Sequence, residues 1–160
     1  MNKEIDPNVL LAPKDQLNFI HQDEQFIDQN ITASQAYYLM TSKPPKWLKI
    51  AFKIRDFFSQ HLGGVQPIQG FNSQTKVLEL GGKADFFDVI QVSKHALFLQ
   101  STDKHLSVLV VLKIDNYDEQ KNLLRIYTSV VTYNFFGKIY MLPVSMVHSV
   151  IVRRLLRNLK

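Results

Sequence analysis

The second half of the chain alternates between apolar runs and short turn-forming stretches. Four runs rich in Val, Ile, Leu, Phe and Tyr are separated by stretches such as Ser-Lys and Thr-Asp-Lys. This spacing is typical of β-strands joined by hairpins, and short connections make neighbouring strands antiparallel. We therefore predict strands at residues 86–92, 96–101, 105–115 and 123–134.

After the last predicted strand the apolar pattern takes a helical period. A helix that begins at Phe136 places on one face Tyr140, Val144, His148, Ile151, Val152, Leu155 and Leu159. Pro143 is expected to kink or split this helix, because proline has no backbone N–H. His148 has two interpretations: it packs in the core with one satisfied hydrogen bond, or it faces a cavity and meets a ligand's polar atom.

Weaker patterns in the first half predict one strand and two helices. Residues 17–27 suit a polar first strand, and Thr32 and Ser34 are candidate caps of a short helix that extends to Met40. A medium-length helix follows two prolines and carries Trp47 and other apolar residues at helical spacing.

Together these elements predict an α+β fold, in which a curved antiparallel sheet wraps around the long C-terminal helix. The two short-to-medium helices follow the first strand. We expect one domain over residues 15–160 after a flexible lead-in at residues 1–14. Residues 65–84 are rich in Gly, Gln and Asn and predict a long loop with at most one short strand, at residues 76–80. A straight helix against a curved sheet tends to leave a cavity between them.

Composition narrows the class of protein. The 160 residues are 46% hydrophobic and 21% charged, which is ordinary for a globular domain. The absence of cysteine excludes disulfides, thiol nucleophiles and zinc sites built from cysteine. The N-terminus does not have the pattern of a signal peptide, and no apolar run reaches the length of about 18 residues that a membrane span needs. We expect a cytoplasmic protein without an integral membrane segment.

The net charge of +5 is unevenly distributed. From Phe135 to the end there are five bases and no acid, namely Lys138, Arg153, Arg154, Arg157 and Lys160. Cations near a helix C-terminus are favoured by the helix dipole, which explains them without a partner. The alternative is weak contact with an acidic partner or a membrane surface.

Most motif-based activities are excluded by the sequence. No histidines are paired at helical spacing, so we expect no metal site. There is no Gly-rich phosphate-binding motif and no nucleophile elbow. The aromatic residues occupy apolar-face positions, so we expect no nucleic-acid partner.

Acid–base chemistry and ligand binding both have candidate residues. Asp103 and His105 share a predicted hairpin turn, where the carboxylate either orients the imidazole or caps the turn's backbone. His148 is the second candidate acid or base. The candidate ligand-binding residues are His148, His105, Thr128, Thr132, Asn134 and Tyr140.

A set of spaced residues carries a family resemblance. One run contains Thr128, Val130, Asn134, Gly137 and Tyr140, and it is followed by Pro143 and His148. Two further pieces are Trp47 with Arg55-Asp56 on the early helix, and Asp103-Lys104-His105-Leu106 at a strand start. This pattern resembles an uncharacterised bacterial family of unknown function in the START-like, or polyketide-cyclase-like (SRPBCC), helix-grip superfamily.

The resemblance implies a curved sheet that grips the C-terminal helix around an apolar cavity. It implies binding of a small apolar molecule, and a minority of such relatives are enzymes. Two alternatives are carried by residues of this chain: an enzyme with a His/Asp acid–base pair in that cavity, and a membrane-surface or partner module that uses the basic C-terminal helix. For the enzyme, Asp103 or Asp56 would orient a histidine. No cofactor is implied, because the chain lacks the reductase-like domain to which some relatives are fused. The residues with an expected structural or anchoring role are Trp47, Arg55, Asp56, Gly137 and Pro143.

Overall fold

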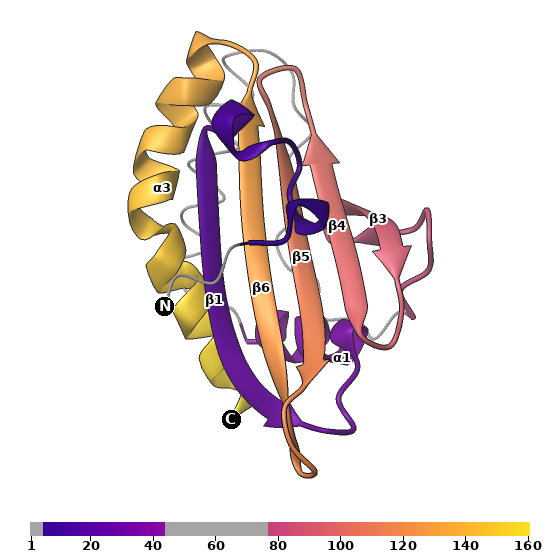
Figure 1. Cartoon of the computed structure of the whole chain (residues 1–160). Coiled ribbons are helices and arrows are strands. Elements are labelled where there is room, and N and C mark those ends of the chain that lie inside the picture. Colours follow the sequence, from indigo (N-terminus) through magenta and orange to yellow (C-terminus); the bar gives the residue numbers. More distant parts are fainter. Residues whose placement is uncertain (1–4, 44–76) are drawn as a thin grey trace.

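The computed structural model describes residues 5–43 and 77–160, and these form an α+β fold (Figure 1). The sheet is antiparallel and six-stranded, in the order β1-β6-β5-β4-β3-β2. Its strands are β1 (Phe19–Asp28), β2 (Lys83–Ala84), β3 (Phe87–Val92), β4 (Ala96–Thr102), β5 (Leu106–Asn116) and β6 (Lys121–Thr132). Among the described residues, two α-helices accompany the sheet, α1 (Ala33–Thr41) and α3 (Phe135–Leu156). The predicted fold class, with its curved antiparallel sheet and long C-terminal helix, is confirmed.

The strands match the apolar pattern closely, with one exception. β1, β3, β4, β5 and β6 each begin and end within two residues of the predicted bounds. The exception lies in the predicted loop at residues 65–84, which allowed at most one short strand, at residues 76–80. From Val77 onward its short strand is instead β2, and residues 77–80 form no strand. A turn replaces the expected strand: Gly81 has φ +78°, and the N–H of Gly82 donates to the carbonyl of Glu79 at 3.0 Å. Such a turn suits glycine, which tolerates positive φ.

Each face of the sheet has its own apolar cluster. The larger one lies on the inner face, the face that α1 and α3 cover (Figure 1). There, Leu97, Leu99, Leu112 and Leu124 are fully buried beneath residues of both helices. The period of two along each strand explains this division, because alternate side chains point to opposite faces.

The N-terminal segment packs on the opposite, outer face. It forms two 3-10 turns, Pro7–Val9 and Lys14–Gln16, which cross in front of the sheet in Figure 1. Val9 is 2% exposed and packs with Leu109 and Tyr127. The N–H of Leu11 also donates to Ser129 Oγ at 2.9 Å. The described part of the expected lead-in therefore covers apolar surface of β5 and β6.

Helix α1 begins at a capping box. Thr32 Oγ1 accepts from the N–H of Gln35, while Gln35 Oε1 accepts from the N–H of Thr32. This arrangement satisfies two donors that a helix start leaves free. The second predicted helix, with Trp47, Arg55 and Asp56, lies outside the described residues, as do residues 65–76 of the predicted loop.

Helix α3 runs as one helix through Pro143, so of the two predicted effects of this proline, a kink or a split, the split is wrong. Proline removes one helical hydrogen bond, and the carbonyl that loses its partner belongs to the exposed residue Ile139. Water can satisfy that carbonyl, so the helix continues. The predicted apolar face points inward, with Val152 and Leu155 buried against the sheet.

Candidate functional site

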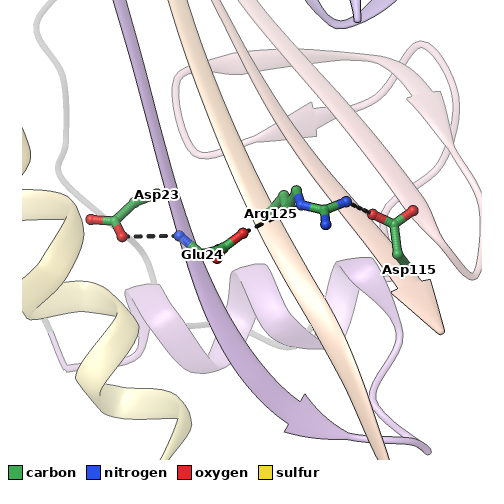
Figure 2. A network of polar contacts seen from close by, with 4 residues as sticks. All are labelled: Asp23, Glu24, Asp115 and Arg125. Carbon is green, nitrogen blue, oxygen red and sulfur yellow. Dashed lines mark hydrogen bonds and ion pairs between the residues drawn. The ribbon is translucent and has the colours of Figure 1, made fainter. Parts of the chain in front are cut away.

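The edge strand β1 carries a polar stretch on the inner face of the sheet. His21 lies opposite Thr128 of β6, and Asp23 lies opposite Ile126. Figure 2 shows that Asp23 and its neighbour Glu24 point to opposite sides of β1, with Asp23 on the side of α3. Strand geometry thus places His21 and Asp23 together beneath the C-terminal helix.

His148 of α3 meets β1 at this stretch. Its ring packs edge-on against Phe19, with centroids 5.1 Å apart, and against His21, with centroids 5.0 Å apart. The two imidazoles are inclined by 71°. His148 therefore has an aromatic neighbour and a second titratable group on the same strand.

Burial keeps both imidazoles neutral at neutral pH. Loss of solvent, followed by the charge of His21, lowers the pKa of His148 to about 4. Burial also lowers the pKa of His21, against the opposing influence of Asp23, and Arg153 adds to the lowering. A neutral imidazole has one donor and one acceptor nitrogen, so this pair offers both kinds of hydrogen bond.

Several polar atoms on this face are buried without a hydrogen bond among the described residues. They include Nδ1 of His21, Nδ1 of His148 and Oγ1 of Thr132. Asp23 Oδ2 likewise has no hydrogen bond, although Arg153 Nε lies 3.4 Å away as an ion pair. Leaving such an atom unpaired costs about 1–3 kcal/mol, so each is suited to receive a polar group that the described residues do not supply. His21, Asp23 and His148 are called the inner polar cluster below, whereas Thr132 lies apart from them, beside Gly137 at the start of α3.

The other predicted residues gather at a different place, the junction between the β4–β5 hairpin and the start of α3. Asn134 caps α3 by accepting from the N–H of Gly137 at 3.1 Å. The same side chain donates to the carbonyl of Lys104 and lies 3.1 Å from His105 Nδ1. His105 and Asn134 therefore join the hairpin to the helix.

Asp103 caps the turn rather than orienting the imidazole. Its Oδ1 accepts from the N–H of His105 at 2.7 Å and from the N–H of Leu106 at 3.0 Å. In the described part of the chain, no histidine side chain has a hydrogen bond to a carboxylate. Of the two interpretations of Asp103, the geometry matches the turn cap.

The remaining predicted residues are distributed as follows. Thr128 is 3% exposed on the inner face beside His21, and Tyr140 is half-buried on α3. Pro143 is exposed within α3. Trp47, Arg55 and Asp56 lie outside the described residues. Over residues 5–43 and 77–160, no three His, Cys, Asp or Glu side chains are grouped so that they could hold a metal ion.

Sequence reasoning missed His21 and Asp23. The available signal was alternation, since Phe19, His21, Asp23, Gln25 and Ile27 occupy every second position of β1. Only two of these five are apolar, so the pattern looked weak and its inner face was not identified. Identifying His148 as their neighbour required the position of α3.

A second polar network lies on the outer face, where Arg125 is central (Figure 2). Arg125 forms ion pairs with Asp115 of β5 and with Glu24 of β1. Its side chain is only 16% exposed, because it lies flat across the sheet between these carboxylates. This network links three neighbouring strands, which is a structural role.

Comparison with known proteins identifies a family for this chain. Residues 15–155 match the model of a family described as "Protein of unknown function (DUF2867)". No curated protein matches the chain.

Proposed function

The chain belongs to this family of unknown function. From the geometry of the inner polar cluster, we propose that the protein binds a small, mainly apolar molecule between the inner face of the sheet and α3. The ligand's polar group would be held by His148 and His21. This proposal takes the chain as a member of the START-like helix-grip superfamily. The curved antiparallel sheet and the long C-terminal helix support that assignment.

The observation that carries the proposal is the edge-to-face contact of two imidazoles whose Nδ1 atoms have no hydrogen bond among the described residues. Two neutral histidines whose ring centroids lie 5.0 Å apart offer both hydrogen-bond donors and acceptors to one hydroxyl, carbonyl or carboxyl group. A few placed polar groups on an apolar wall are the usual composition of a small-molecule site.

The surrounding side chains supply that apolar wall. Val108 and Val110 of β5 are partly buried and pack against the larger apolar cluster of the inner face, as does Ile151 of α3. Phe19 contacts His148 directly. A ligand that reaches His148 would therefore lie mainly against aliphatic and aromatic groups.

Native mass spectrometry of the purified protein tests the proposal, because a retained apolar molecule would appear as a mass adduct. Binding of 1-anilinonaphthalene-8-sulfonate, an apolar probe with one anionic group, provides a second readout. We expect His148→Phe to weaken probe binding by about tenfold, because it removes one hydrogen bond to a charged group. His95→Phe is the matched control, since His95 is exposed in the β3–β4 turn.

Absence of any adduct, together with equal probe binding by wild type and His148→Phe, would refute the proposal. The acid–base alternative requires a histidine hydrogen-bonded to a carboxylate. The part of the chain that the structure describes contains no such pair. Asp56, the other carboxylate considered for this role, lies outside the described residues. The imidazole pair supports binding as the proposed function, with the acid–base enzyme as its alternative.

A further inference from the structure

Helix α3 has a second apolar face, which points away from the sheet. Its outward positions over four turns are Phe135, Phe136, Ile139, Leu142, Met146 and Val150. Met146 is 81% exposed and Leu142 is 66% exposed. An exposed apolar stripe of this extent indicates an interaction surface rather than scattered surface residues.

The same face becomes basic at the end of the helix. Arg153, Arg154, Arg157 and Lys160 are all exposed, and Lys138 lies beside the apolar stripe. No acidic residue occurs from Phe135 to Lys160. Arg153 pairs with Asp23, whereas Arg154, Arg157 and Lys160 have no ion pair among the described residues.

By length and composition alone, the helical segment Phe135–Leu159 could cross a membrane, a test that core helices of soluble proteins also pass. Unlike a typical core helix, only 17% of its most apolar part is buried in the protein. Its inward residues Met141, Val152, Leu155 and Leu156 nevertheless pack inside the domain. The helix can therefore offer its outward face to a bilayer and keep its inward face on the sheet, which describes a surface contact rather than a span.

We propose that α3 docks the protein on the surface of an anionic lipid bilayer. The apolar stripe from Phe135 to Val150 enters the boundary between headgroups and acyl chains, and the basic end contacts the anionic headgroups. Interfacial helices bind through these two contributions together, apolar burial and attraction to anionic lipid. This inference is independent of the proposed ligand, because it uses the opposite face of the helix.

Charge favours a lipid surface over a second copy of the chain. A parallel pair of α3 helices would bring two basic ends together, and like charges repel. An antiparallel pair would set Arg154 and Arg157 of one copy against the apolar Phe135 end of the other. Neither arrangement pairs these cations with an acidic residue of α3. An anionic bilayer does supply negative partners, its lipid headgroups.

Vesicle co-sedimentation of the full chain tests the inference. The probes are vesicles of phosphatidylcholine alone and vesicles of phosphatidylcholine and phosphatidylglycerol in equal parts. We expect binding to the anionic vesicles only, and weaker binding at about 0.5 M salt because salt screens the attraction. Arg154→Gln with Arg157→Gln should weaken it by roughly tenfold to a hundredfold.

A second double variant tests the apolar stripe. Leu142→Gln with Met146→Gln should abolish insertion while the unfolding temperature of the lipid-free protein stays unchanged, since both residues are exposed. Lys14→Gln with Lys94→Gln is the matched control, because it removes two exposed cations elsewhere and should bind like wild type.

Three results would overturn the inference. The first is equal binding to both vesicles, or binding that neither double variant changes. The second is an unfolding temperature lowered by several degrees in Leu142→Gln/Met146→Gln, which would mean that another part of the chain already covers the stripe. The third is a lipid-free dimer that this variant converts to monomer, without vesicle binding, which would assign the face to a second copy.

Discussion

Gly137, at the start of α3, lies directly against the backbone of His105 at the start of β5. A Cβ atom added to Gly137 would lie 2.3 Å from the carbonyl oxygen of His105, closer than any real contact. That carbonyl also accepts from the N–H of Tyr133 at 2.7 Å, which holds it in place. The helix can start here only because position 137 has no side chain.

We predict that Gly137→Ala destabilises the protein by about 2–3 kcal/mol, because the helix start must move away from β5. Urea unfolding measures the change. Lys138→Ala, at the exposed neighbouring position, is the control and should change stability by less than about 0.5 kcal/mol. A Gly137→Ala variant as stable as wild type would contradict the close contact.

Asn134→Ala should lower the free energy of unfolding by about 1–2 kcal/mol. The substitution removes the cap on the N–H of Gly137 together with the links to Lys104 and His105. Asn134→Asp keeps the capping acceptor but loses the donor to the Lys104 carbonyl, so it should be intermediate. Thermal unfolding of wild type, Asn134→Asp and Asn134→Ala gives the order of their stabilities. Equal unfolding midpoints would show that the contacts of Asn134 contribute nothing to stability.

His148 should make stability depend on pH. Its pKa is about 4 in the folded protein, against 6.5 for an unperturbed histidine. Below about pH 6.5 the imidazole is protonated in the unfolded chain, whereas in the folded protein it is protonated only below about pH 4. The free energy of unfolding therefore falls as pH falls through this window. The loss approaches about 3 kcal/mol at about pH 4.

Urea unfolding at several pH values between about 7 and 4 checks this prediction. His148→Phe should lose less stability over the window than wild type, because the unfavourable proton uptake has been removed. His95→Phe should retain the wild-type decline, since His95 is exposed. Parallel curves for wild type and His148→Phe would show that His148 is not protected from protonation.

The two ion pairs of Arg125 should differ in strength, and the pair with Asp115 should be the stronger. Asp115 is 36% exposed and Glu24 is 55% exposed, so solvent screens the second ion pair more. A double-mutant cycle with Arg125→Ala should give a coupling of about 1 kcal/mol to Asp115 and about 0.3 kcal/mol to Glu24. A larger coupling to Glu24 than to Asp115 would refute this ranking.

Some features of the candidate site could be predicted from sequence and others could not. The inward position of His148 follows from the helical period of its own segment, which local sequence controls. Its neighbour His21 could not be identified in the same way, because β1 has too few apolar residues for a clear alternation. Sequence alone allows two roles for Asp103, since a carboxylate near a turn can accept a hydrogen bond either from a backbone N–H or from a side chain.

The sequence by itself determined the five longer strands, the capped start of α1, and the inward face of α3, because apolar periodicity and capping act over a few residues. It also determined the basic end of α3, which is a matter of composition. Only the tertiary structure decided that His21 lies beneath His148 and that Leu142 and Met146 are left exposed by the other described residues. These relationships depend on the register between β1 and β6 and on where α3 rests. Both are set by packing between segments far apart in the chain.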